Sequence, residues 1–563
     1  MSFRHAYVSL TPYSVHRYYI QVVKPFPPKL LFPEGSPHSA IHVSSHAAED
    51  LGVDSISELL QADGLRPREA YDIFAAPVSD PEIIRYRQEV FQDFRTYSDL
   101  RERFRALLPR FDELSGFTQA RREAMSPLQQ TIWRLGELEL LVECVETLAE
   151  TLESSAGPDS RALRDLDQFL AHMRARKDYQ TMRDRLPEIR GGLQYRKSVT
   201  LGVNLDDKLR PVEVAVLDIH DKPFVERSLV GRLFGSQREF SVSSAVLSSP
   251  IPPELSTQDR SRIPLAPLFQ EIEQLLSGAL RPIQRALGAY VHENTELFRG
   301  LRREVAFFLG AVALADRLER AGLPTCIPEI TESSTDESIV GMYNPHLSLR
   351  GERGGEVPEQ IVLNDIRFGD KQRFFVLTGP NQGGKTTFTQ AVGLVHLFAQ
   401  TGIFAPAREA VIAPVDVLDT HFPTAEHGSL ETGRLSDEAA RLSEIVDNIT
   451  HDSLILLNES FASTSPHEAV SLAGELLKVL AEVGVRGVFA THLHELALNT
   501  AEFGTGIAPL TAEAVITNDS AERTYRVREG PPAGNSFARD IAVKHGLSYE
   551  QMKSRLRARG IEV

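Results

Sequence analysis

Hydrophobic residues recur every three to four positions through much of the first half of the chain. After Ser126-Pro127, one apolar stripe contains Leu128, Ile132, Leu135, Leu138, Val142, Val145, Ala149 and Leu152. Most positions between them are Glu, Arg, Gln or Thr, so the stripe predicts a long amphipathic helix that buries one face against a partner. Helical periodicity returns from Leu265 to Arg320 and stops at Gly322 and Pro324.

Residues 198–219 follow a different pattern, with apolar residues at every second position. The alternating residues are Val199, Leu201, Val203 and Leu205, followed by Val212, Val214 and Val216. This period predicts a pair of strands that interrupts the helices. The polar stretch TESSTDES then marks a domain boundary near Ser333. We therefore expect a short leader over residues 1–70, a helical region over 71–332 and an α/β domain over 333–563.

A glycine-rich loop lies between a predicted strand and a predicted helix. The apolar run from Phe374 to Leu377 leads into Gly379-x-x-x-x-Gly384-Lys385-Thr386, which is the pattern of a phosphate-binding P-loop. Glycines let successive amides face phosphate oxygens, and the helix amino terminus adds a positive dipole end. We expect Lys385 to contact the β and γ phosphates of ATP, and Thr386 to bind Mg²⁺. The predicted nucleotide-binding residues of this loop are Gly379, Pro380, Asn381, Gln382, Gly383, Gly384, Lys385, Thr386 and Thr387.

A second apolar strand, SLILLNE over residues 453–459, ends in the polar pair Asn458-Glu459. P-loop ATPases usually carry an Asp at the first position, where it helps to hold Mg²⁺, and a Glu at the second can polarise the attacking water. Asn458 keeps an oxygen acceptor but lacks the charge, so we expect weaker Mg²⁺ affinity or slow turnover. The predicted metal ligands are Thr386, Asn458 and Glu459. Glu459 is also the predicted general base, and a surface carboxylate at a strand end is the alternative.

A third strand, from Gly487 to Thr491, is followed by His492. A polar residue at the carboxyl end of a core strand beside a P-loop points into the crevice, where a histidine could contact the γ phosphate. His494 is a competing candidate, and either residue could be a loop histidine. The predicted catalytic set is therefore Lys385, Glu459 and His492.

These three blocks together resemble the ATPase domain of the MutS family of DNA mismatch-repair proteins over the last 230 or so residues. TGPNQGGKTT is similar to the family's TGPNMGGKST, LILLNESFASTSPHEAVSLA resembles its Walker B segment, and FATHLHEL resembles its ATH-containing strand. FAAPVSDPEIIRYRQEVFQDF and FRGLRREVAFFLGAVALADRLERAG resemble its helical core and returning lever helix. The resemblance implies a multidomain chain: a mainly α-helical core and lever region followed by an α/β P-loop ATPase domain of the ABC type.

The resemblance also implies two further site residues. Ser436 falls where the family has a serine that reaches the nucleotide of the other subunit in a dimer. A helix cap is the alternative, because Asp437 and Glu438 would fill the first turn of a helix. Asn364 falls where the family has an asparagine near the adenine.

Two departures from the family indicate a shortened member. Family members that read mismatches carry an amino-terminal domain with a Phe-x-Glu wedge, and too little sequence precedes the lever region to hold that domain. Phe32-Pro33-Glu34 matches the letters but lies in a proline-rich stretch without a strand pattern. We also expect no carboxy-terminal nuclease domain, because the chain stops soon after the ATPase.

Composition bears on how the chain could contact DNA and on its localisation. The 563 residues carry 61 Lys and Arg against 77 Asp and Glu, a net charge of −16, so any DNA contact must use local basic surfaces. The candidates are Arg101 to Arg110, Arg174 to Lys177 and Arg302-Arg303, although charge on a helix is ordinarily a solvated face. Two cysteines and the lack of a long apolar run favour a cytoplasmic protein without a membrane segment.

The resulting expectation is an ATP- and Mg²⁺-dependent ATPase that resembles MutS. It would act as a homodimeric clamp or lever on DNA in mismatch repair or recombination-related maintenance, with the dimer formed through the ATPase domains. An ATP-driven structural or signalling protein that grips a protein or ribonucleoprotein partner is the alternative. A transporter-type ATPase is a third reading, against which the long helical arm and TGPNQGGKTT argue.

Overall fold

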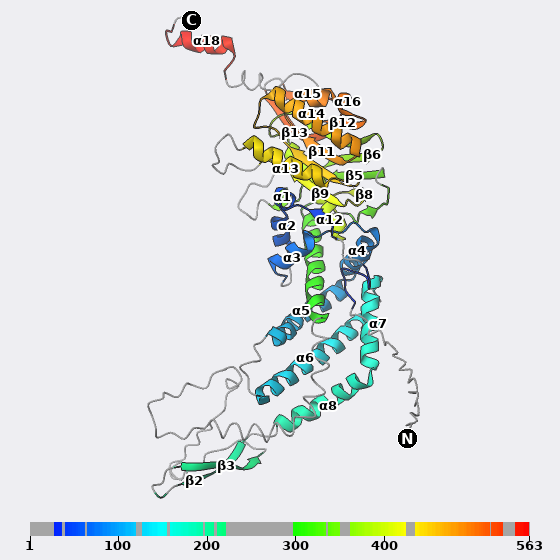
Figure 1. The fold of residues 1–563 in the computed structure, drawn as a ribbon, viewed down its shortest axis with the longest axis vertical. Helices are drawn as coiled ribbons and strands as arrows, with labels where there is room; N and C mark the ends of the chain where they lie inside the picture. The colour runs from blue at the N-terminus through cyan, green and yellow to red at the C-terminus, as the bar shows by residue number, and fades with distance from the viewer. Residues whose placement is uncertain are drawn as a thin grey trace, which may run out of the picture.

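The computed structural model describes residues 28–36, 40–61, 65–119, 127–154, 158–194, 198–205, 207, 211–220, 297–333, 336–349, 361–423, 434–517, 520–532 and 546–561. Helices and strands are both abundant, and they are arranged along one long axis (Figure 1). A mixed sheet with flanking helices lies toward one end, and a helical arm extends away from it. In the described residues, no helix is both long and apolar enough to cross a bilayer.

The arm is built from long helices. They are α4 (Pro81–Thr96), α5 (Ser98–Gln119), α6 (Pro127–Ser154), α7 (Arg161–Ala175), α8 (Lys177–Gln194) and a helix over residues 297–320. The apolar stripe predicted for α6 is buried at Leu135, Leu138, Val145, Ala149 and Leu152. The two alternating segments form an antiparallel hairpin, β2 (Ser198–Leu205) and β3 (Pro211–His220), at the far end of the arm (Figure 1). Of the periodic stretch predicted from 265 to 320, the part before 297 lies outside the described residues.

Within the part of the chain that the structure describes, the sheet has eleven strands, with a parallel core in the order β1-β9-β10-β11-β7-β12. The core strands are β1 (His42–Val43), β7 (Gln372–Thr378), β9 (Val417–His421), β10 (Leu454–Asn458), β11 (Arg486–Ala490) and β12 (Gly506–Thr517). Five further strands complete it: β4 (Glu329–Ile330), β5 (Asp336–Met342), β6 (Asn364–Gly369), β8 (Glu409–Ile412) and β13 (Ser520–Glu529). Apart from β1, the first strand of the sheet along the chain is β4, which pairs with β8 and lies slightly before the boundary predicted near Ser333.

Helices cover both faces of the parallel core, which explains why its strands are continuous apolar runs. One face, with Phe375 and Leu456, packs on α12 (Lys385–Thr401) in an apolar core that continues into the arm. The other face, with Phe374 and Leu457, packs on α13 (Arg434–Asn448) and α14 (Pro466–Val483). The remaining helices of this part are α11 (His346–Leu349), α15 (His494–Leu498), α16 (Thr500–Phe503) and α18 (Tyr549–Ala558).

Residues 28–60, which we call the N-terminal segment, correct one prediction. Part of the short leader predicted over residues 1–70 forms β1, α1 (Ser45–Asp50) and α2 (Val53–Leu59), and α3 (Pro67–Phe74) begins before its predicted end. β1 extends the parallel sheet beside β9, and Ser44 donates a hydrogen bond of 2.6 Å to Asp419. Such short elements depend on tertiary packing, so they leave little periodic signal in the sequence.

Candidate functional site

The loop over residues 379–384 connects β7 to the amino terminus of α12. Two of its glycines have backbone angles that disfavour other residues, with φ of 143° at Gly379 and 89° at Gly384. A Cβ at Gly379 would lie 2.8 Å from the carbonyl oxygen of Ala512, and one at Gly384 would lie 3.3 Å from the ring of Tyr525. The loop therefore requires glycine for its conformation and for close packing.

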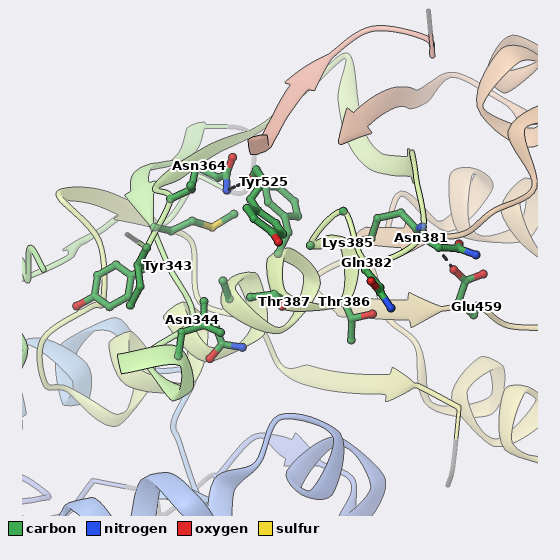
Figure 2. Close-up of a pocket in the computed structure, with 18 residues that line it drawn as sticks. Tyr343, Asn344, Asn364, Asn381, Gln382, Lys385, Thr386, Thr387, Glu459 and Tyr525 are labelled. Carbon is green, nitrogen blue, oxygen red and sulfur yellow. Dashed lines mark hydrogen bonds and ion pairs between the residues drawn. The ribbon is translucent and has the colours of Figure 1, made fainter. Parts of the chain in front are cut away.

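A cavity of about 560 Å³ opens over this loop and the first turn of α12. Its lining comprises Met342, Tyr343, Asn344, Leu347, Ile361, Val362, Asn364, Asn381, Gln382, Gly383, Gly384, Lys385, Thr386, Thr387, Phe388, Ala391, Glu459 and Tyr525. Figure 2 shows Lys385 and Glu459 toward one end and Tyr343, Asn344 and Asn364 toward the other. The cavity is thus polar and charged at one end and offers aromatic and apolar surface at the other.

Lys385 is nearly buried, with 6% of its surface exposed. Its Nζ donates hydrogen bonds to the carbonyl oxygens of Gly379 at 3.2 Å and Pro380 at 3.4 Å, and it lies 3.7 Å from Glu459 Oε1. Burial lowers the pKa of Lys385, and the attraction of Glu459 partly opposes this shift. The lysine is therefore held against the loop, beside a carboxylate.

Thr386 and Asn458 meet at the base of the loop. The Thr386 hydroxyl donates a hydrogen bond of 3.1 Å to Asn458 Oδ1. Mg²⁺ prefers oxygen ligands and is commonly bound by one or two carboxylates together with substrate phosphates. These two neutral oxygens, with the Glu459 carboxylate nearby, fit Mg²⁺ in the type of ligand but supply less negative charge than an Asp would.

Glu459 and His492 form a close pair. Glu459 Oε2 accepts a hydrogen bond from the backbone N–H of His492 at 3.1 Å and lies 2.6 Å from His492 Nδ1. His492 is half exposed and does not line the cavity, so its phosphate contact stays a prediction. His494 lies deeper, and burial lowers its pKa, with the charge of Lys385 acting in the same direction.

Asn364 lines the cavity, but its carboxamide is already engaged. Its Nδ2 donates to the carbonyl oxygen of Tyr525 at 3.1 Å, and its Oδ1 accepts from the N–H of Val527 at 2.8 Å. Its place near an adenine therefore stays a prediction, while its contacts to the backbone of β13 hold Tyr525 over the loop. Sequence reasoning missed Tyr525, because nothing near it indicates that β13 folds back onto this loop.

Ser436 lies apart from the cavity. It is exposed in the first turn of α13, which begins at Arg434, and it does not line the cavity of its own chain. The capping alternative is wrong, because the helix begins before Ser436 rather than after it. The preceding residues 424–433 lie outside the described part of the chain.

The basic clusters that we considered for DNA contact are largely paired with acids. Ion pairs join Arg103 to Asp99, Arg105 to Glu102, Arg110 to Glu143, Arg174 to Glu146 and Glu153, and Arg176 to Asp178. Arg302 is buried between Glu69 and Asp112. Most of the arginines in these clusters are therefore paired with acids, whereas Arg101 donates to the carbonyl oxygen of Phe94.

In the wedge-like match Phe32-Pro33-Glu34, the first two residues are partly buried and Glu34 is exposed. Phe32 is partly buried against the core, and the Arg87 guanidinium lies 4.6 Å from the centre of its ring. Because Phe32 packs against the core, we reject the match to the Phe-x-Glu DNA wedge.

Two family models match the chain. The model of MutS domain V matches residues 375–554, and the model of the MutS2 N-terminal domain matches residues 79–321. A DNA mismatch repair protein MutS from Chlorobaculum parvum is 32% identical over 226 residues, which are 40% of this chain and 25% of that protein. An Endonuclease MutS2 from Lacticaseibacillus casei is 35% identical over 200 residues, or 34% of this chain and 24% of that protein.

A second DNA mismatch repair protein MutS, from Chlorobium chlorochromatii, is 28% identical over 320 residues, which are 52% of this chain and 35% of that protein. The matches thus span about a third or less of the length of these curated relatives. The two family models nevertheless match consecutive parts of this chain, one over the arm and one over the sheet with its loop. The chain belongs to the MutS family.

Proposed function

We propose that the chain binds and hydrolyses ATP in the cavity over residues 379–387. The observation that carries this proposal is the convergence of a glycine loop, a buried lysine, a threonine that is hydrogen-bonded to Asn458, and a glutamate at one end of a single cavity. Loop amides and the amino terminus of α12 would bind the phosphates. The ring of Tyr525, held by Asn364, offers a face on which a base can stack.

The chain's own residues supply positioning and charge. Lys385 would exchange its loop carbonyl contacts for phosphate oxygens, and Glu459 would accept a hydrogen bond from the attacking water and orient it. His492 contacts one oxygen of the Glu459 carboxylate, Oε2, whereas Lys385 lies nearer the other, Oε1. Thr386 and Asn458 would hold Mg²⁺, which neutralises charge that develops on the phosphates.

A DNA role for the arm extends this proposal. Family membership and the names of the relatives support mismatch repair or related DNA maintenance, with nucleotide state biasing two arrangements of a dimeric clamp or lever. The ion-paired arginines of the arm favour a second candidate, in which the arm grips a protein or ribonucleoprotein partner. Binding to homoduplex, mismatched and four-way-junction DNA, with and without ATP and over a salt series, separates them. Phosphate contacts give a steep salt slope, whereas binding absent at every salt concentration favours the second candidate.

Lys385→Ala tests the nucleotide site directly. Loss of one charged contact to phosphate should weaken ATP binding about 10- to 100-fold, as measured by titration with a fluorescent ATP analogue. Lys478→Ala is a matched control, because this exposed lysine of α14 lies outside the lining of the cavity and pairs with nearby Glu475. Unchanged ATP affinity in Lys385→Ala would contradict the assigned site.

A further inference from the structure

The candidate general base sits on a strained turn. Glu459 and Phe461 both have positive φ, 52° and 65°, which side-chain-bearing residues rarely adopt. Such a conformation is strained for a residue with a side chain and persists only where the surroundings hold it in place. The conformation that aims Glu459 at the cavity therefore needs an anchor.

Ser460, between these two residues, provides a buried attachment point. It is 2% exposed, and its Oγ lies 2.8 Å from Nδ1 of His421, which is also 2% exposed. His421 ends β9, the strand beside β10, and its Cα pairs in register with that of Leu457. The contact thus joins the turn after β10 to the end of the neighbouring strand.

Two further contacts hold the ends of the turn. The N–H of Glu459 donates a hydrogen bond of 2.7 Å to the carbonyl oxygen of Ala490 on β11, and the Phe461 ring is buried in the apolar cluster beneath α14. His421 is held neutral: burial lowers its pKa to about 4, and the positive charge of Arg441 acts in the same direction. The ring can therefore serve as an uncharged hydrogen-bond partner at neutral pH.

We propose that His421 is a positioning residue, which holds Ser460 and thereby aims the Glu459 carboxylate at the nucleotide cavity. This inference rests on the proposed ATP hydrolysis and adds a residue to which neither the sequence motifs nor the family match gives a role. His421 touches neither the cavity nor the reacting atoms, so its effect must pass through the turn. A purely structural histidine would instead stabilise the fold without affecting Glu459 selectively.

Variants of both partners separate these two roles. His421→Ala and Ser460→Ala should each lower kcat for ATP hydrolysis about tenfold, and His421→Gln, which keeps a polar side chain of similar reach, should recover part of the loss. ATP affinity should stay within about twofold of wild type, because the contacts to phosphate are retained. Thr401→Val is the matched control: it removes another buried hydroxyl, bonded to the Leu397 carbonyl oxygen at 2.6 Å at the far end of α12, and should leave kcat unchanged.

Hydrogen exchange on the nucleotide-free protein gives an independent measurement. The N–H of His492 donates to Glu459 Oε2, so it reports the position of that carboxylate. Both alanine variants should speed amide exchange at residues 459–461 and at His492, while Thr401→Val should not.

Four outcomes decide the question. Normal kcat and normal exchange in both alanine variants would overturn the inference, as would a joint fall of kcat, ATP affinity and thermal midpoint without selective exchange at His492. A selective fall in kcat with faster exchange at His492 would support it. A wild-type protein that hydrolyses no ATP would overturn the proposed function instead, and it would remove the reaction on which this role depends.

Discussion

Individual side chains around the loop show an unusual balance of charge. Lys385 and Glu459 supply one charge of each sign at the end of the cavity, while Asn458 and Thr386 satisfy each other through a neutral hydrogen bond. Because residue 458 is an asparagine, this position offers a cation a neutral oxygen and no carboxylate.

Asn458→Asp should restore that charge with almost no change in volume. We expect the Mg²⁺ concentration for half-maximal ATP hydrolysis to fall about tenfold, because a carboxylate binds a hard cation more strongly than a carboxamide does. The measurement is a Mg²⁺ titration of hydrolysis at saturating ATP. An unchanged or higher Mg²⁺ requirement would show that residue 458 does not face the metal.

Among the elements, α12 and the N-terminal segment connect the loop to the arm. α12 begins at the loop, and at its other end Arg87 of α4 donates a hydrogen bond of 3.3 Å to the carbonyl oxygen of Thr401. The same guanidinium donates a hydrogen bond of 2.8 Å to the carbonyl oxygen of Leu31, so it also contacts the N-terminal segment. A displacement of α12 would therefore be transmitted to both the arm and the N-terminal segment.

The packing of this segment on the helix over 297–320 can be tested with two glycines of that helix. A Cβ at Gly310 would lie 2.1 Å from the carbonyl oxygen of Leu60, whereas one at Gly300 meets no atom within 4 Å. Gly310→Ala should lower the free energy of unfolding by about 1–3 kcal/mol through overpacking. Gly300→Ala should raise it by about 0.5–1 kcal/mol through helix propensity. Chemical denaturation of both variants checks this, and equal effects would contradict the close contact.

Glu304 should make the contact between the N-terminal segment and the helix over residues 297–320 sensitive to pH. Its Oε2 accepts a hydrogen bond from the N–H of Leu30, and burial raises its pKa to about 7, although the charges of Lys29, Arg87 and Arg303 oppose the shift. The pKa of Glu304 is therefore higher in the folded chain than in the unfolded chain, so protonation of this carboxyl favours the folded state. This contribution to the free energy of unfolding is complete below about pH 4.5 and is lost as the pH rises through about 7.

Glu304→Gln should remove that dependence. Between pH 5.5 and pH 8, the thermal midpoint should fall more steeply for the wild type than for the variant. The wild type should lose at most about 3 kcal/mol more in free energy of unfolding over this range than the variant does. Thermal unfolding of both proteins at the two pH values provides the comparison. Parallel pH profiles would show that Glu304 titrates normally.

At the scale of the whole molecule, Ser436 is exposed and lies outside the lining of its own cavity, so the predicted contact with a nucleotide requires a second subunit. If Ser436 acts across a dimer, a mixture of Lys385→Ala and Ser436→Ala chains should regain activity that neither variant has alone. A mixed dimer then contains one complete site, so an equal mixture should reach about a quarter of wild-type hydrolysis. Activity no higher than the mean of the separate variants would contradict action across the dimer.

The sequence by itself determined the local elements around the site. Continuous apolar runs predicted the strands that end at Thr378, Asn458 and Ala490, and glycine spacing predicted the bend before α12. The three-to-four-residue period predicted the helix that contains Leu138, and alternation predicted the hairpin at the end of the arm. These features depend on interactions between residues close in the chain, which a local pattern records.

Only the tertiary structure decided which distant residues join that site. It packed the N-terminal segment beside β9, brought β13 over the loop so that Asn364 binds its backbone, and placed His421 against Ser460. It also paired the arginines of the arm with acids from other turns and helices. Such contacts join residues far apart in the chain and depend on how elements pack, so no local periodicity or motif spacing encodes them.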